Sequence, residues 1–302
     1  MRLHASREDQ LVFGTKRATA MKQILSIQSH VAYGYVGNRA ATLPLQRLGH
    51  EVTVINTVQF SNHTGYLKWT GEVFSAAHIE SILDGLESLG ALEKMDALLT
   101  GYLGDPAIGD IILQLLDRLP KHIRWLCDPV MGDVGRGFFV RPGIPDYFRQ
   151  KALARASIIT PNQFELEYLA GRQILTLDDA VKACRMIHET GPEIVLLTSL
   201  IHDGTRDDEI QMLASSKSGE QFLATTPRLP LDPAPNGAGD CTSALFLGHI
   251  LSGATLDEAL SKTASSIFAL FEKTRQAGRR ELHMIAAQDD FAHPAPLSVT
   301  RL

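Results

Sequence analysis

The sequence has few cysteines, and its histidines lack the spacing of a zinc site. Of 302 residues, 3 are cysteine, and Cys127, Cys184 and Cys241 are too far apart to form a CxxC pair. The 11 histidines include no HExxH spacing, so the common zinc signatures are missing. An odd number of well-separated cysteines fits a reducing compartment, and we expect a cytoplasmic protein.

Strong charge and long apolar segments are missing too. The formal net charge of −5 argues against nucleic acid as a partner, because non-specific binding needs clustered lysine and arginine. No apolar run approaches the ~18 residues of a membrane span, and we expect no membrane partner. Residues 1–20 mix basic with acidic side chains and lack an apolar segment, so a signal peptide is not expected. We predict a disordered extension at 1–20, with organelle targeting as the weaker alternative, and a single domain over 21–302.

Two widespread nucleotide-binding motifs are also absent. No GxxxxGK[ST] sequence occurs, which excludes a P-loop enzyme. Gly132, Gly135 and Gly137 do not form GxGxxG and do not open a helix, so a Rossmann dinucleotide site is not supported. Backbone amides would have to hold the phosphates of a nucleotide instead.

The chain does contain a turn of small residues before an apolar helical run. Residues 236–241 read Asn-Gly-Ala-Gly-Asp-Cys. Small residues let the backbone turn tightly and approach a ligand, and the first amides of the following helix favour an anion. Asp240 would stand beside that anion as a base, as phosphoryl transfer to a hydroxyl requires. The alternative is that Asp240 is only the N-cap of the helix.

Short apolar β-rich runs alternate with helical patterns along the chain. Such a βαβ series predicts an α/β fold with a mostly parallel sheet that helices cover on both faces. The expected strands are 23–27, 52–57, 97–100, 124–127, 157–159 and 194–198, and a hairpin is expected at 209–226. The expected helices are 38–48, 78–89, 107–119, 145–154, 163–170, 177–190, 241–251 and 256–276.

Polar side chains follow the predicted strands, where ligands of parallel sheets gather. Asp128 and Asp133 follow one strand, and they either hold Mg²⁺ near phosphates or are turn residues. Asn162 and Glu165 follow the next strand, where Glu165 either orders the water shell of Mg²⁺ or completes a capping box. The glycine-rich stretch 132–140 is either a mobile lid or an ordinary surface hairpin.

Residues 26–38 and 56–65 combine aromatic with hydrogen-bonding side chains. Apolar walls with a few fixed donors and acceptors suit a small polar aromatic ligand. His63 within the second segment, taken alone, is more often structural than catalytic.

Together these segments resemble pyridoxal kinases of the ribokinase-like superfamily, over about residues 22–302. The resemblance rests on Ser26–His30, Gly34–Ala41, Asn56–Tyr66, Thr100–Tyr102, Cys127–Asp133, Thr160–Glu165 and Gly237–Asp240. The Asn56–Tyr66 segment is very specific to vitamin B6 kinases, whereas the Gly-Ala-Gly-Asp turn is shared across the superfamily.

The resemblance implies a three-layer αβα sandwich and ATP-dependent phosphorylation of the 5′-hydroxyl of pyridoxal, pyridoxine or pyridoxamine in vitamin B6 salvage. It implies Mg²⁺, the monovalent cation K⁺ and a homodimer. The catalytic turn would use Asp240 as general base and the amides of Gly237, Ala238 and Gly239. Asp128 and Glu165 would serve Mg²⁺, with Asp133, Asn162, Thr198 and Ser199 near the ATP phosphates. The vitamer would meet Ser29, Val36, Val58, Phe60, His63, Thr64 and Tyr102.

Two positions and two rival functions qualify this prediction. Many pyridoxal kinases carry threonine where this chain has Ala238, and Cys127 either approaches the pyridoxal aldehyde or merely fills a strand end. A kinase for a hydroxymethylpyrimidine or a sugar is the nearest rival, and the Asn56–Tyr66 segment argues against it. A non-catalytic B6-binding protein is the other rival. It would not need Asp240 beside Asp128 and Glu165.

Overall fold

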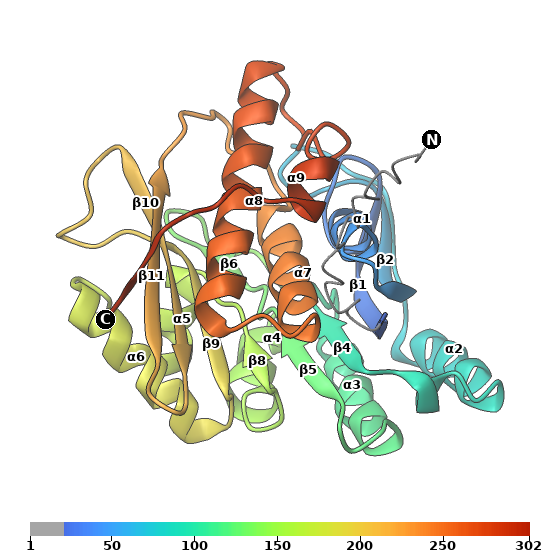
Figure 1. Ribbon diagram of the computed structural model, residues 1–302. Helices are drawn as coiled ribbons and strands as arrows, with labels where there is room; N and C mark the ends of the chain where they lie inside the picture. Colours follow the sequence, from blue (N-terminus) through green and yellow to red (C-terminus); the bar gives the residue numbers. More distant parts are fainter. Residues whose placement is uncertain (1–20) are drawn as a thin grey trace, which may run out of the picture.

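A continuous sheet of 10 strands forms the centre of the computed structural model, which describes residues 21–302 (Figure 1). Its strands are β1 (Gln23–Tyr33), β2 (Glu51–Asn62), β3 (Gly71–Val73), β4 (Ala97–Thr100), β5 (Arg124–Cys127), β8 (Ile158–Ile159), β9 (Ile194–Leu200), β10 (Glu209–Ser216), β11 (Gln221–Pro227) and β12 (Val299–Arg301). They lie in the order β12-β11-β10-β9-β8-β5-β4-β1-β2-β3. The strands from β9 to β2 pair in parallel, and the edge strands pair antiparallel. The predicted mostly parallel sheet is confirmed.

Helices cover both faces of this sheet. In front in Figure 1 lie α1 (Asn38–Arg47), α7 (Ala238–Leu251), α8 (Leu256–Gln276) and α9 (Gln288–Ala292). The other face carries α2 (Ala76–Ser88), η1 (Leu92–Lys94), α3 (Pro106–Arg118), α4 (Ile144–Tyr147), the π-helical turn η2 (Phe148–Ala152), α5 (Gln163–Ala170) and α6 (Leu177–Thr190). The expected three-layer αβα sandwich is therefore confirmed.

The central strands bury both of their faces. In β4, Leu98 packs into the core on the side of α2 and α3, and Leu99 packs into the core beneath α7 and α8. In β9, Leu197 packs into the first of these cores and Leu196 into the second. Because alternate side chains enter different apolar layers, these strands are continuous apolar runs without polar alternation.

Most predicted elements are present, and the differences follow from where the strands lie. β1 and β2 are longer than expected because they continue as a pair up to Tyr33 and Asn62, with polar and aromatic residues that do not form an apolar run. The sequence pattern does not predict β3, β12 or α9, which are short. The helix expected at 145–154 is present, but it changes from α to π geometry at Phe148. The predicted extension at 1–20 lies outside the described residues.

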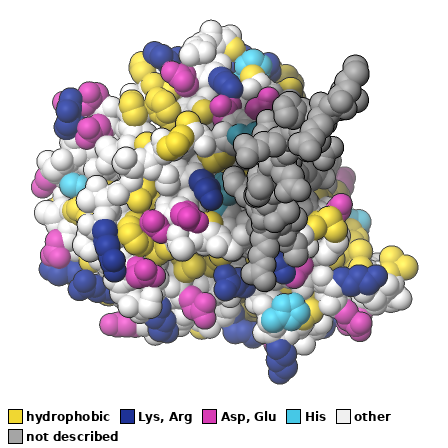
Figure 2. All heavy atoms as spheres, viewed as in Figure 1, with side chains coloured by type: hydrophobic (Ala, Val, Ile, Leu, Met, Phe, Trp, Pro, Cys, Tyr) yellow, Lys and Arg dark blue, Asp and Glu magenta, His cyan; other side chains and the backbone are white. Residues whose placement is uncertain are grey.

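The surface view shows mixed charges. On the face in Figure 2, lysine and arginine alternate with aspartate and glutamate, and no continuous basic patch appears among the coloured residues. Among the helices of residues 21–302, none combines the length and the apolar character that crossing a membrane requires.

Close packing of α3 on α4 gives a test of the fold. A Cβ on Gly109 of α3 would lie 2.5 Å from Cε2 of the buried Tyr147. Gly109→Ala should therefore lower the free energy of unfolding by about 1–3 kcal/mol, because a rigid ring has to shift. Gly85→Ala in α2 is the matched control, since its Cβ would meet nothing within 4 Å. It should raise the free energy by about 0.4–1 kcal/mol. Urea unfolding measures both, and equal shifts would contradict this packing.

Candidate active site

The N-terminus of α7 lies against the loop between β1 and α1. Gly237 precedes the helix with a φ of 91°, a left-handed conformation that favours glycine. A Cβ at Gly237 would lie 1.7 Å from the backbone oxygen of Tyr35, so only glycine permits this contact. Within the described chain no side chain caps α7. Its first amides are therefore available to an anion.

Asp240 lies inside the first turn of α7. The apolar run predicts a start at Cys241, but the helix begins at Ala238 with Gly237 as its N-cap. The alternative in which Asp240 is the N-cap is therefore wrong. The Asp240 side chain is half-buried, and the backbone amide of Gly37 lies close enough to its carboxylate to act against the rise in its pKa. Burial raises the pKa of Asp240 to about 6 in spite of that amide, and a carboxylate with this pKa can act as a base near neutral pH.

Asp128 shares this corner of the molecule. Its side chain is 4% exposed, and a Cβ on Gly239 would lie 3.9 Å from its Oδ2, which places that oxygen beside the first turn of α7. The Ser243 hydroxyl donates to the same oxygen over 3.1 Å. Burial, followed by the negative charges of Glu165 and Asp240, raises the pKa of Asp128 well above its ordinary value.

Glu165 is buried nearby and joins two loops. Its Oε1 accepts from the Met131 amide and its Oε2 accepts from the Asn162 amide, each over 2.9 Å. Asn162 returns the contact by accepting from the Glu165 amide. The capping box is therefore confirmed, and a role of Glu165 beside Mg²⁺ stays a prediction. Burial raises the pKa of Glu165 to about 8 despite these amides.

Asp128, Glu165 and Asp240 are called the acidic cluster below. Across residues 21–302, no three or more His, Cys, Asp or Glu side chains are arranged as a metal-ligand set. A divalent cation beside this cluster would therefore also need oxygen ligands from phosphate or water, which Mg²⁺ accepts readily. The donor set fits such a cation, because both Glu165 and Asp240 repel the Asp128 carboxylate, and a positive charge would relieve that repulsion.

The residues expected near ATP phosphates lie on β9 and on the segments after β5 and β8. The backbone amide of Thr198, in the second half of β9, donates to the Pro161 oxygen over 2.9 Å. Thr198 also pairs with Asn162 in an isolated bridge. Ser199 has a φ of 53°, and it is the one non-glycine residue with positive φ in the described part of the chain. Such strained backbone is concentrated at functional sites.

The glycine-rich stretch 132–140 forms a hairpin of β6 (Gly132–Asp133) and β7 (Gly137–Phe138). The Phe138 ring packs edge-on against Phe164 and Tyr168 of α5, with ring centroids 5.0 and 5.1 Å apart. Asp133 is exposed on this hairpin. The hairpin interpretation is confirmed, and movement as a lid stays a prediction.

Several side chains expected to contact the vitamer pack together. Val58 and Phe60 of β2 are buried in one cluster with Val31, and Val36 and Tyr102 pack against it. The structure thus joins residues from the first, second and fourth strands and their loops into one apolar wall.

Ser29 connects this wall to the base. Its side chain is 7% exposed, and a Cβ on Gly37 would lie 2.4 Å from its Oγ. The Gly37 amide also lies near Asp240, so Ser29 and Asp240 are both neighbours of this glycine. Thr64 is half-buried in the loop after β2.

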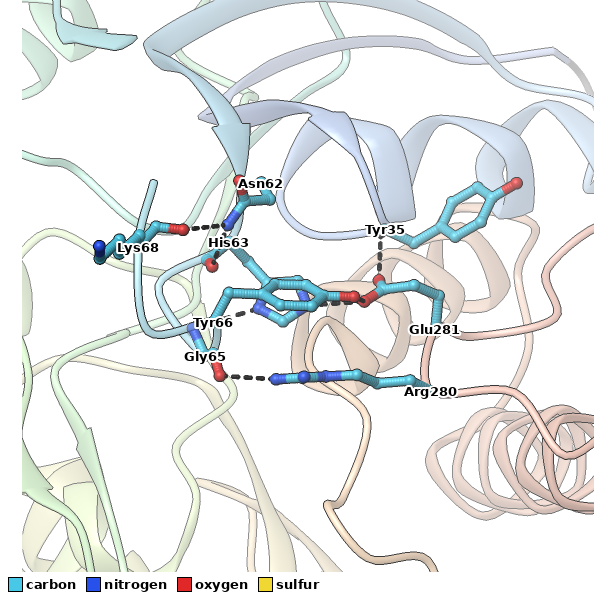
Figure 3. Close-up of polar contacts among 8 residues, drawn as sticks. All are labelled: Tyr35, Asn62, His63, Gly65, Tyr66, Lys68, Arg280 and Glu281. Carbon is cyan, nitrogen blue, oxygen red and sulfur yellow. Dashed lines mark hydrogen bonds and ion pairs between the residues drawn. The ribbon is translucent and has the colours of Figure 1, made fainter. Parts of the chain in front are cut away.

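His63 is 5% exposed, and its ring contacts a residue that the sequence does not predict. Its Nε2 lies 2.9 Å from Oε1 of Glu281, in the segment after α8 (Figure 3). Sequence reasoning also misses the roles of Gly37 and Ser243. Ser243 lies one helical turn after Asp240, so its spacing was a usable signal, whereas Glu281 is far from His63 in sequence and offers none.

Comparisons with known proteins show the family to which this chain belongs. Residues 47–284 match the family model described as phosphomethylpyrimidine kinase. A pyridoxal kinase PdxY from Rubrobacter xylanophilus is 51% identical over 90% of this chain and 94% of its own length. One from Deinococcus radiodurans is 46% identical over 92% and 96%. A pyridoxal kinase from Leishmania donovani, solved with ADP and pyridoxamine, has a TM-score of 0.87 at 30% identity and covers 93% of this chain and 99% of its own.

Charge repulsion in the acidic cluster predicts a stabilising mutation. An aspartate whose pKa is raised by folding contributes stability at low pH that is lost as the pH rises through its folded pKa. Asp128→Asn should therefore raise the melting temperature at pH 8 by at least about 2 °C. The gain should shrink as the pH falls toward about 4, the ordinary pKa of aspartate.

Asp179 gives the control of opposite sign. A hydrogen bond from Arg172 holds the pKa of Asp179 well below its ordinary value, so Asp179→Asn should lower the melting temperature at pH 8. Calorimetry at both pH values measures the two variants. A melting temperature of the Asp128 variant below that of the wild type at pH 8 would contradict the repulsion.

Proposed function

Since this chain belongs to the pyridoxal kinase family, it phosphorylates B6 vitamers to their 5′-phosphates, and we propose that Asp240 is the general base of this reaction. One observation carries the proposal: a carboxylate with a pKa of about 6 lies in the first turn of a helix that no side chain of the described residues caps. The 5′-hydroxyl of the vitamer would give its proton to this carboxylate while its oxygen attacks the γ-phosphorus of ATP.

The amides at the start of α7 would receive the transferred phosphoryl group. Gly237, Ala238 and Gly239 carry these amides, and the positive end of the helix dipole lies behind them. Preorganised donors of this kind stabilise negative charge that develops in the transition state. Because only the backbone is used, alanine at 238 in place of a threonine preserves these donors.

Asp128 and Glu165 would hold Mg²⁺ directly or through its waters. When bound, Mg²⁺ neutralises charge on the phosphates. Ser243 keeps Asp128 oriented toward α7, and the amides of Met131 and Asn162 fix Glu165. On the family resemblance we also propose K⁺ as a monovalent cofactor.

ATP would lie across the loops after β5 and β8 and the end of β9. The Leishmania donovani relative was solved with ADP, which supports an adenine nucleotide here. Asp133, Asn162, Thr198 and Ser199 of this chain would then lie near its phosphates. Strain at Ser199 is consistent with a backbone shaped for a ligand.

The vitamer ring would lie on the apolar wall. Complexes of the Leishmania donovani relative with pyridoxamine and with pyridoxine support a pocket for several vitamers. Ser29 would meet the pyridine nitrogen, and Thr64 would add a polar contact. Val36, Val58, Phe60, His63 and Tyr102 would form the walls. The reacting hydroxyl would then face Asp240, which lies near Gly37 and the wall residues.

We further propose a homodimer in the cytoplasm. Tyr33 at the end of β1 and Leu67 and Trp69 in the loop between β2 and β3 are exposed by 62, 100 and 45%, and exposed apolar side chains of this size are common at interfaces. Cys127, with the other two cysteines, is buried and free, which suits a reducing compartment. The high pKa that burial gives Cys127 favours its role as a strand-end filler over reaction with the aldehyde.

A hydroxymethylpyrimidine kinase is the second candidate, because the matching family model carries a pyrimidine kinase description. The two functions share α7 and differ in the ring pocket. An ATP-dependent assay with pyridoxal and hydroxymethylpyrimidine as competing substrates separates them. We expect pyridoxal to have the higher kcat/KM, and preference for the pyrimidine would reverse the assignment.

Asp240→Asn should reduce kcat by about 10²–10⁴-fold, which is the usual contribution of a positioned base. In the wild type, kcat/KM should fall about tenfold per pH unit below about 6, since protonated Asp240 cannot accept the hydroxyl proton. The variant should lose this acid limb. Asp257→Asn is the control, because Asp257 lies in the first turn of the following helix and should retain full activity. If the Asp240 variant turned over at the wild-type rate, Asp240 would not be the general base.

A further inference from the structure

Glu281 is a buried carboxylate that gathers hydrogen bonds from two loops. Its side chain is 4% exposed. Oε1 accepts from the Tyr66 hydroxyl over 2.7 Å and lies 2.9 Å from His63 Nε2, and Oε2 accepts from the Tyr35 amide over 3.3 Å (Figure 3). One loop, after β1, carries Tyr35, and the other, after β2, carries His63 and Tyr66. Both are loops of the proposed vitamer pocket.

This network assigns the tautomer of His63. The Gly65 amide donates to His63 Nδ1 over 3.2 Å, so Nδ1 carries no proton. Nε2 then carries the proton and donates it to Glu281. Both ring nitrogens are therefore engaged within the protein. His63 can offer the vitamer only ring carbons, as a wall of fixed orientation.

Arg280 also holds the loop after β2, through Tyr66 and Gly65. Its guanidinium lies 3.8 Å from the centre of the Tyr66 ring and donates to the Gly65 oxygen over 2.8 Å. Figure 3 shows Arg280 beneath the Tyr66 ring and the Glu281 carboxylate at the end of the Tyr66 hydroxyl. Burial acts to raise the pKa of Glu281, but hydrogen bonds from His63 and Tyr66 outweigh it and lower that pKa, so the carboxylate stays ionised.

The Glu281 carboxylate fits against the first loop only because residue 34 is glycine. A Cβ on Gly34 would lie 2.3 Å from Glu281 Oε2, and Gly34 has a φ of 93°. Glycine at 34 therefore permits the Tyr35 amide to reach Glu281. A larger residue would separate the first loop from the segment after α8.

Both loops held by Glu281 also touch the catalytic turn. The Tyr35 oxygen lies against Gly237, where a Cβ would be 1.7 Å away. A Cβ on Gly65 would lie 2.5 Å from Nδ2 of Asn236. Asn236 and Gly237 lead directly into the turn that carries Asp240. One carboxylate thus fixes two pocket walls and the segments that pack on the phosphoryl-transfer corner.

We propose that Glu281 is a positioning residue that fixes the His63 tautomer and docks both vitamer loops against the catalytic turn. This inference rests on the proposed function, because its kinetic consequence is measured on the vitamer. Glu281 would act through these loops and would not itself touch the vitamer. Its side-chain hydrogen bonds within residues 21–302 go to Tyr35, His63 and Tyr66, and none goes to the loops after β5 and β8 or to β9.

Glu281→Gln tests the proposal by keeping the size and changing one acceptor into a donor. The new NH₂ group must face either the Tyr35 amide or the His63 N–H, so a donor meets a donor in both orientations. We expect KM for pyridoxal to rise about tenfold or more, while KM for ATP stays within about twofold. Asp290→Asn is the matched control, since Asp290 pairs with Lys273 in the same C-terminal region and should leave both KM values unchanged.

Two further measurements make the test independent of folding defects and of the substrate assignment. If the glutamine variant does not fold, Tyr66→Phe carries the test, because it removes one donor to Glu281 and keeps the ring beneath Arg280. It should raise KM for pyridoxal alone. ¹⁵N NMR of the free wild type should show His63 protonated at Nε2 and not at Nδ1. This readout needs no substrate, so it tests the network even if pyridoxal proves not to be phosphorylated.

A folded Glu281 variant with unchanged KM for pyridoxal, or an equal rise in both KM values, would overturn the positioning role. A proton on Nδ1 of His63 would overturn the network itself. Absence of pyridoxal phosphorylation by the wild type would instead refute the proposed function.

Discussion

The backbone contact between Gly237 and Tyr35 is the constraint on which the rest of the site depends. It brings the N-terminus of α7 against the loop after β1 with no side chain between them. The helix dipole, its first amides and Asp240 therefore face the carboxyl ends of the parallel strands, where the other site residues lie. The same approach lets the Gly37 amide reach Asp240. Without it, the base and the vitamer loop would belong to separate surfaces.

This arrangement concentrates negative charge in a place that burial makes unfavourable. Glu165 and Asp240 both repel Asp128, and burial raises the pKa of all three carboxylates. Hydrogen bonds from Ser243 and from backbone amides offset only part of this cost. A protein selected for stability alone would have neutral residues at these positions. The presence of three carboxylates is consistent with a site that binds a nucleotide together with a metal cation, whose positive charge would offset their repulsion.

Much of the fold was predictable from the sequence, because helix and strand patterns repeat locally. β4, β5, α5, α6 and α8 have the predicted bounds, since apolar runs and caps define them. The start of α7 could not be predicted, because a glycine N-cap has no side-chain signature and a turn of small residues does not look helical. The acidic cluster was predictable as residues on neighbouring loops. Glu281 was not, because its contacts with His63 and Tyr35 join segments more than 200 residues apart.

The most direct measurement of the central claim is a crystal structure with a non-hydrolysable ATP analogue and pyridoxal. The account predicts the terminal phosphate against the first amides of α7 and the 5′-hydroxyl within hydrogen-bond reach, about 2.6–3.2 Å, of the Asp240 carboxylate. It also predicts the pyridine ring on the wall formed by Val58 and Phe60. A phosphate bound away from α7, or a hydroxyl that faces a residue other than Asp240, would contradict it.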